Sequence, residues 1–202
     1  PSHWEQQGFG KYDYGRDYRT YGKKFKFADE KGMYKYAFQV PADWINRKVF
    51  IVFEGSMTDT EVKINGQLAG DIHQGAFYQF KYDITDKLKF GQENLLEATV
   101  SKMSTDPSVN RAERFADYWV FGGIFRPVYL ESFPVEHIER VAIDAKADGS
   151  FAMDVFVKNL KENRTVSAEI IDSKSKVVAF CNANAGGKDS LITLSCKVVN
   201  PA

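Results

Sequence analysis

The segment from Ala116 to Val128 combines residue types that a plain hydrophobic core does not need. It holds the acid Asp117, four aromatic side chains, the pair Gly122-Gly123 and the base Arg126. Paired glycines permit a positive φ and a close approach of the backbone to a neighbour, so a tight or closely packed turn is expected here. Asp117 precedes this turn, where its carboxylate is either exposed and aimed outward or caps the turn by accepting backbone N–H bonds.

No other set of residues has the spacing of a metal or nucleotide site. His3, His73 and His137 lie far apart in the sequence and lack the spacing of zinc ligands. The run Gly186-Gly187-Lys188 lacks the rest of a phosphate-binding loop and is interpreted as a turn. We therefore expect no cofactor, and no metal site formed by this chain alone.

The two cysteines, Cys181 and Cys196, are too few for a disulfide framework. A hairpin turn near Gly186-Gly187 would set Cys181 opposite a residue well before Cys196, which disfavours a direct bridge. We predict two free thiols.

The composition indicates a folded protein without an obvious electrostatic partner. The 202 residues are 44% hydrophobic and 14% aromatic, enough to build a substantial core. Lys+Arg and Asp+Glu both number 27, so no net field attracts nucleic acid. No apolar run approaches the roughly 18 residues that a membrane span needs. We expect neither nucleic acid nor a membrane as a partner.

In residues 33–130, apolar and polar side chains alternate within short segments, and turn-forming residues separate these segments. Such segments are predicted to be β-strands. Asn65-Gly66 predicts a type I′ hairpin, because both central residues of that turn need a positive φ. Asp83–Asp86 is expected to form a turn or a short helical cap, and no amphipathic helix of ten or more residues is expected. This pattern indicates an antiparallel sandwich or barrel. The predicted strands are residues 33–40, with Tyr34, Tyr36, Phe38 and Val40 on one face, 49–53, buried on both faces, 61–64, 78–82, 96–100 and 128–130.

Residues 1–31 form a segment rich in aromatic side chains and glycine, with no period of its own. Such a segment is ordered only by packing on a surface. One interpretation is a ribbon that stacks sugars or bases. The other, which we favour, is an arm whose aromatic side chains cover the sandwich or a neighbouring domain.

A boundary is expected at Phe133–Glu136, after which the density of aromatic residues falls. Residues 135–202 then show five or six short alternating strands, with Asp148-Gly149 as a turn. That number is typical of a small immunoglobulin-like sandwich that lacks one strand at its C-terminal end.

Six segments, taken in order, resemble the non-catalytic N-terminal part of glycoside hydrolase family 2, which includes β-galactosidases, β-glucuronidases and β-mannosidases. Each segment alone is a weak signal, but their shared order is a strong one. The segments are residues 1–10, residues 36–41, residues 53–55 with 61–66, residues 73–77 with 80–85, residues 91–94, and residues 117–128.

The resemblance implies an all-β chain: a jelly-roll sugar-binding domain over residues 1–134 and an immunoglobulin-like domain over residues 135–202. It also implies a downstream (β/α)8 barrel that carries the acid/base and nucleophile glutamates of a retaining glycosidase. Retaining chemistry needs two carboxyl groups about 5–5.5 Å apart. Glu54, Glu61, Glu136 and Glu139 do not suggest such a pair, so we expect no catalytic residue in this chain. Its expected partners are the barrel and a carbohydrate substrate.

In β-galactosidases the acid that matches Asp117 touches the sugar across the domain boundary, partly through a sodium ion. The resemblance therefore implies a substrate contact, and a possible sodium contact, for Asp117; the alternative is the turn cap described above. Arg111 and Arg114 are further expected substrate contacts, in a loop at residues 101–115 that departs from the β-galactosidase pattern and leaves the sugar open. Arg126 is expected to be a buried partner of an acid.

Two other functions are compatible with the residues. The arm would suit a free-standing carbohydrate-binding module, and the two sandwiches would suit a purely structural or adhesive protein. Similar glycosidases of gut-type bacteria are exported, so the expected location is the periplasm or the exterior.

Overall fold

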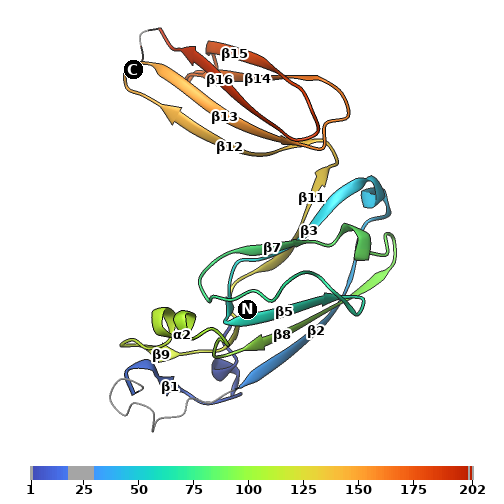
Figure 1. Ribbon diagram of the computed structural model, residues 1–202, viewed down its shortest axis with the longest axis vertical. Helices are drawn as coiled ribbons and strands as arrows, with labels where there is room; N and C mark the ends of the chain where they lie inside the picture. Colours follow the sequence, from blue (N-terminus) through green and yellow to red (C-terminus); the bar gives the residue numbers. More distant parts are fainter. Residues whose placement is uncertain (1, 18–29, 200, 202) are drawn as a thin grey trace. The chain divides into compact units, whose positions relative to one another are not determined.

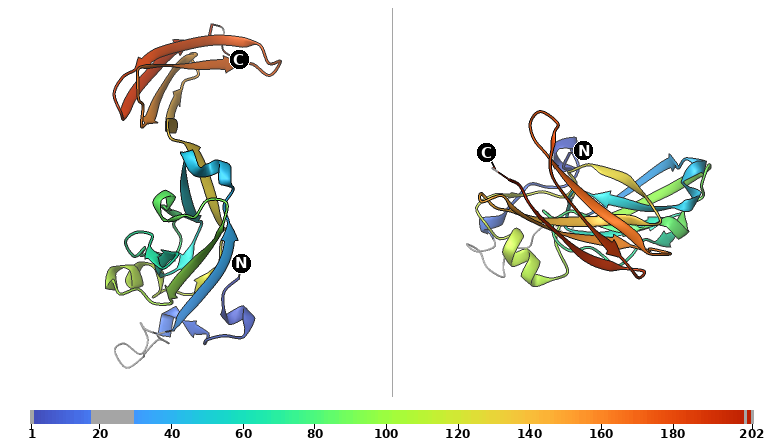
Figure 2. Two further views of the ribbon diagram at one scale, coloured as in Figure 1. Left: turned by 90° about the vertical axis from the view of Figure 1, so that its right-hand side faces the viewer. Right: turned by 90° about the horizontal axis from the view of Figure 1, so that it is seen from above.

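The computed structural model describes residues 2–17, 30–199 and 201, and divides into two compact units, Pro1–Ser132 and Phe133–Ala202 (Figure 1). Strands dominate both units, as Figures 1 and 2 show. None of the helices among these residues is long and apolar enough to cross a membrane. The all-β fold class predicted from the sequence is confirmed.

The first unit is a β-sandwich whose two sheets enclose one core. One sheet has the order β2-β8-β5-β6 and the other the order β11-β3-β7. Apolar side chains from both sheets, among them Val49, Ile51 and Phe53 of one and Val62 and Ala98 of the other, form the core. The strands are β2 (Lys31–Gln39), β3 (Arg47–Phe53), β5 (Asp59–Ile64), β6 (Gln67–Leu68), β7 (Phe80–Asp83), β8 (Glu93–Ser101) and β11 (Val128–Pro134).

Two short strand pairs lie outside these sheets and involve the Ala116–Val128 segment. β1 (Asp13–Tyr14) pairs with β9 (Trp119–Val120), and β4 (Ser56–Met57) pairs with β10 (Gly123–Ile124). The helices of this unit with fully described bounds are short: η1 (Glu5–Gln7), η3 (Ala42–Asn46), η4 (Thr85–Lys87) and α2 (Pro107–Glu113). The side chain of Asp106 caps α2 by accepting from the Ser108 N–H at 2.7 Å.

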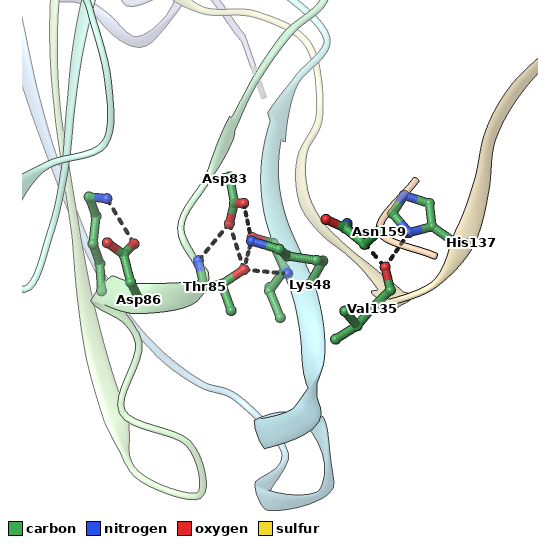
Figure 3. A network of polar contacts seen from close by, with 9 residues as sticks. Lys48, Asp83, Thr85, Asp86, Val135, His137 and Asn159 are labelled. Carbon is green, nitrogen blue, oxygen red and sulfur yellow. Dashed lines mark hydrogen bonds and ion pairs between the residues drawn. The ribbon is translucent and has the colours of Figure 1, made fainter. Parts of the chain in front are cut away.

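The local turn chemistry agrees with the sequence. Asn65 and Gly66 have φ values of 51° and 80° and join β5 to β6, so the predicted hairpin is confirmed. The predicted cap near Asp83 is also present: its carboxylate accepts from the Thr85 N–H at 3.0 Å and pairs with Lys48 at 2.8 Å (Figure 3).

One side chain of β2 departs from its predicted environment. Tyr34 and Phe38 pack against the core, but Tyr36 is 68% exposed although it was expected on the same face. β2 is the outer strand of its sheet, and Tyr36 borders an open groove between β2 and β11. The facing sheet therefore does not cover this side chain.

The second unit contains five strands among its described residues, within the expected five or six. β12-β13-β16 form one sheet, β14 and β15 form another, and buried side chains such as Val155, Val166 and Leu194 form its core. Near the start of the unit, the Val135 carbonyl lies 3.2 Å from Nδ1 of His137 and accepts from the Asn159 side chain at 3.1 Å (Figure 3). The strands are β12 (His137–Ala145), β13 (Ser150–Lys158), β14 (Arg164–Ile171), β15 (Val177–Ala185) and β16 (Ser190–Lys197).

Both cysteines are free thiols, as predicted. Cys181 lies on β15 and Cys196 on β16, and the two strands belong to different sheets rather than to one hairpin ladder. Burial, together with a hydrogen bond to Cys196, raises the pKa of the Cys181 thiol to about 11. Cys181 is therefore protonated and a poor nucleophile at neutral pH.

Candidate functional site

Asp117 lies at an exposed corner, where the β1–β9 pairing brings it to the arm. Tyr14 donates its hydroxyl to Oδ1 of Asp117, and Arg16 pairs with Oδ2 at 3.1 Å. The Asp117 side chain is 57% exposed. Asp117 is therefore aimed outward and oriented by side chains of the arm, 103 residues away for Tyr14. This geometry favours the outward-facing interpretation of Asp117 over the turn cap.

The turn after Asp117 is closely packed because Trp4 is inserted against its glycines. A Cβ added to Gly122 would lie 2.0 Å from Cζ2 of Trp4, and one added to Gly32 would lie 2.6 Å from Cζ3. The Trp4 N–H also donates to the Gly122 carbonyl at 3.2 Å. Gly123 has a φ of +106°. The paired glycines are therefore needed both for conformation and for space, as the sequence indicated.

Buried charges fasten the arm to the corner and to β8. Glu5 accepts from the Gly122 N–H at 3.1 and 3.2 Å, and pairs with Lys102 at 3.0 Å. Lys102 also pairs with Asp13 at 3.4 Å and with Glu30 at 3.2 Å. Burial acts to lower the pKa of Lys102, but its ion pairs with Glu5 and Glu30 outweigh burial and raise it. Lys102 is therefore a charged, fully buried anchor.

The loop before Asp117 contains α2 and is held by two buried acids. Asp59 accepts from the Thr105 N–H at 2.7 Å and from its hydroxyl at 2.8 Å. Glu113 accepts from the Ala76 N–H at 2.8 Å. These bonds leave little freedom in the position of the loop. The sequence did not single out Asp59, Lys102 or Glu5, because a single acid or lysine has the same local pattern whether it is buried or exposed.

Arg114 is placed differently from its expected role. It is only 1% exposed, and its Nη1 donates to the Phe121 carbonyl at 3.2 Å. Burial lowers its pKa to about 10. Its burial argues against a direct substrate contact. Arg114 instead stabilises the corner through its hydrogen bond to the Phe121 carbonyl. Arg111, in the last turn of α2, is exposed and stays available to a ligand or a partner.

Arg126 is also placed differently: it is exposed, and the prediction that it is a buried partner of an acid is wrong. Its Nη1 donates to the backbone carbonyls of Glu54 at 3.3 Å and Phe77 at 3.2 Å, and its guanidinium lies 5.0 Å from the Phe125 ring centre. The Glu54 carboxylate instead accepts from Tyr129 at 2.7 Å. Arg126 therefore ties loops together at the rim of the sandwich.

The sodium contact implied by the family resemblance does not fit the residues of this chain. Both carboxylate oxygens of Asp117 are engaged, and one of them already has the Arg16 guanidinium as its counter-ion. Among the described residues, no group of three or more His, Cys, Asp and Glu side chains is arranged to hold a metal ion. A second cation at Asp117 would be repelled by Arg16.

The first unit is therefore a β-sandwich that carries an exposed, oriented carboxylate at its rim. Residues 1–134 match the family model described as "Glycosyl hydrolases family 2, sugar binding domain". The chain belongs to glycoside hydrolase family 2, and these residues are its sugar-binding domain.

Similar proteins include enzymes of two activities. The chain is 29% identical to a β-galactosidase of Thermoanaerobacter pseudethanolicus, over 83% of this chain and 23% of the relative. It is also 29% identical to a β-glucuronidase of Formosa agariphila, over 83% of this chain and 20% of the relative. A solved family 2 β-glucuronidase superposes with a TM-score of 0.71 at 27% identity, covering 87% of this chain and 21% of that one. The chain therefore spans about a fifth of the length of these proteins.

Proposed function

We propose that this chain is the non-catalytic N-terminal part of a family 2 glycosidase that hydrolyses β-glycosides. Residues 1–134 would form the sugar-binding domain and residues 135–202 an immunoglobulin-like domain. Hydrolysis would be carried out by a (β/α)8 barrel elsewhere in the same polypeptide. The observation that carries the proposal is Asp117, held outward by Tyr14 and Arg16 on a domain that belongs to this family.

In this role Asp117 positions the substrate. An ionised carboxylate accepts strong hydrogen bonds from sugar hydroxyl groups. Tyr14 and Arg16 fix the direction of that carboxylate, so little orientational freedom is lost when the sugar binds. Orientation of a substrate over the reacting groups of another domain lowers the activation barrier without any chemistry in this domain.

The surface around Asp117 suits a protein partner. Tyr12, Tyr118 and Trp119 are exposed large side chains on the arm and the corner. Tyr12 lies edge-on to Trp119, with ring centres 6.2 Å apart. Exposed aromatic side chains of this kind are enriched at the centres of protein interfaces. We assign this surface to contact with the barrel, with Arg111 at its edge.

The decisive test replaces Asp117 by Ala in the complete enzyme. Removal of a hydrogen bond to a charged group costs about 1.5–3 kcal/mol, so kcat/KM for the accepted glycoside should fall about 10- to 150-fold. Tyr14→Phe keeps the carboxylate but frees one oxygen, and a smaller loss is expected. Asp86→Ala, which removes an exposed acid paired with Lys87, is the matched control and should leave kcat/KM unchanged. Equal kinetics for Asp117→Ala and the wild type on every accepted glycoside would exclude this role.

A further inference from the structure

The two thiols of the second unit lie in contact, and the function proposed above gives neither of them a role. Cys181 lies on β15 and is 7% exposed, whereas Cys196 lies next to the last residue of β16 and is half-buried. The Cys181 side chain is hydrogen-bonded to that of Cys196. Cys196 also packs against the apolar core that contains Cys181. The second unit therefore holds a pair of thiols rather than two isolated cysteines.

The arrangement of β15 and β16 removes the objection that the sequence raised against a bridge. In a single hairpin ladder, Cys181 would face a residue well before Cys196. β15 instead pairs with β14, where Cys181 is opposite Ala168, and β16 pairs with β13, where Cys196 is opposite Phe151. β15 and β16 contact each other as members of different sheets (Figure 1). Hairpin register therefore does not decide which of their side chains meet.

The two thiols differ in how a reagent reaches them. Cys196 follows the buried Ile192 and Leu194 on the inward face of β16, but it is only half-buried at the end of that strand. A small reagent therefore meets Cys196 first. Cys181, which is buried and protonated at neutral pH, is the second thiol to react.

We propose that Cys181 and Cys196 form a reversible disulfide, which joins the two sheets of the second unit when the chain meets a small disulfide oxidant such as oxidised glutathione. A disulfide needs its two sulfur atoms about 2.05 Å apart. Because the thiols are already in hydrogen-bond contact, side-chain rotation closes the remaining distance while every strand keeps its partners. The pair is then closed in an oxidising environment and open in a reducing one.

The reaction is a thiol–disulfide exchange in two steps. The Cys196 thiolate attacks one sulfur of oxidised glutathione, which forms a mixed disulfide and releases one glutathione. The Cys181 thiolate then attacks the Cys196 sulfur, which forms the bond between the two cysteines and breaks the bond to the second glutathione. The two protein thiols are oxidised and the glutathione disulfide is reduced. The two protons that the protein thiols lose are carried by the two released glutathione thiols.

The bridge should stabilise the second unit through its effect on the unfolded chain. It would close a loop of about 15 residues and so remove conformational freedom from the unfolded state. The chain has two cysteines, so no other bridge within one chain competes with this one. Oxidation should therefore raise the resistance of the second unit to denaturant.

The first test treats the folded 202-residue chain with excess oxidised glutathione, blocks the remaining thiols with iodoacetamide and analyses tryptic peptides by mass spectrometry. Trypsin cuts after Lys188, between the two cysteines, so the bridge would link residues 177–188 to residues 189–197. We expect this linked pair as the main product, and its loss after reduction with dithiothreitol. Two free thiols, glutathione adducts alone, or bonds only between two chains would overturn the proposal.

The second test measures urea unfolding of the oxidised and reduced chain. Far-UV circular dichroism should show the midpoint of the second unit raised by about 1 M or more after oxidation. Tryptophan fluorescence, which reports on the first unit, should stay unchanged. Cys196→Ser keeps the buried Cys181 in place and should have the same midpoint with and without oxidant.

Two results of the unfolding test would also overturn the proposal. One is a bridged wild type that unfolds at the same or a lower urea concentration than the reduced chain. The other is an equal gain in Cys196→Ser, because the gain would then not come from the bridge. Asp117 lies in the other unit, so Asp117→Ala should form the bridge as the wild type does, whatever its effect on kcat/KM.

Discussion

At the scale of single residues, the glycines around Trp4 matter because the Trp4 ring fills the space that their missing side chains leave. Trp4 occupies the room beside Gly122 and Gly32, and its backbone is bonded to Gly122. The corner that carries Asp117 is therefore shaped by the arm. The addition of one methyl group where Gly122 meets Trp4 should therefore change the free energy of unfolding measurably.

Gly122→Ala should lower the free energy of unfolding of the first unit by about 1–3 kcal/mol, because its Cβ would lie 2.0 Å from the Trp4 ring and force a shift. All three tryptophans lie in the first unit, so urea unfolding followed by tryptophan fluorescence measures it. Gly186→Ala, in the second unit, is the control and should not move the midpoint. An unchanged midpoint for Gly122→Ala would mean that the contact between Trp4 and Gly122 is less tightly packed than its geometry implies.

The burial of His73 should make the stability of the first unit depend on pH. Its burial lowers its pKa below the ordinary value of 6.5, although the hydrogen bond to the Gly75 carbonyl at 3.0 Å opposes this. As the pH falls, the unfolded chain takes up this proton first. The stability contributed by neutral His73 is therefore fully present above pH 6.5 and is lost as the pH falls through the folded pKa.

Unfolding at pH 7 and at pH 5 should show the first unit less stable at pH 5, with a smaller difference in His73→Asn. His3 also has a pKa lowered by burial, so part of the difference should remain in that variant. The NMR titration of His73 checks the cause directly. A folded pKa at or above 6.5 would contradict the prediction.

At the scale of elements, buried charges fasten the arm, together with its own short elements η1 and β1. Lys102, directly after β8, pairs with Glu5, Asp13 and Glu30 of the arm. One lysine therefore joins the arm to a residue next to β8 that is far from it in the sequence. It also supports the strand pair β1–β9 that brings Tyr14 to Asp117.

Lys102→Met should destabilise the first unit by about 3–5 kcal/mol, because it leaves buried carboxylates without their counter-ion. Lys35→Met, which removes an exposed ion pair with Glu97, is the matched control and should cost less than about 1 kcal/mol. Urea unfolding followed by tryptophan fluorescence compares the two. Similar losses in both variants would show that the buried network contributes no more than a surface pair.

At the scale of the whole molecule, the chain consists of two units with separate hydrophobic cores. Asp117 and the corner that carries it lie in the first unit. A change in the core of the second unit should therefore be felt mainly in that unit.

Leu194→Ala should lower the stability of the second unit by about 2–5 kcal/mol, since Leu194 is fully buried in its core. Far-UV circular dichroism, which reports on both units, should show an earlier transition, whereas the tryptophan fluorescence midpoint of the first unit should stay unchanged. Leu191→Ala, an exposed leucine on the same strand β16, is the control. A matching shift of the fluorescence midpoint would show that the units unfold together.

The sequence by itself determined the local features. Alternation predicted the strands, Asn65-Gly66 predicted a hairpin, and six ordered segments identified the family, because strand pattern and turn chemistry depend on neighbouring residues. Tertiary structure alone decided which charges are buried. Arg114 lies inside, Arg126 outside, and Asp117 is oriented by residues of the distant arm. The physical reason is that burial and pairing depend on what packs opposite a side chain, and a local pattern carries no record of that partner.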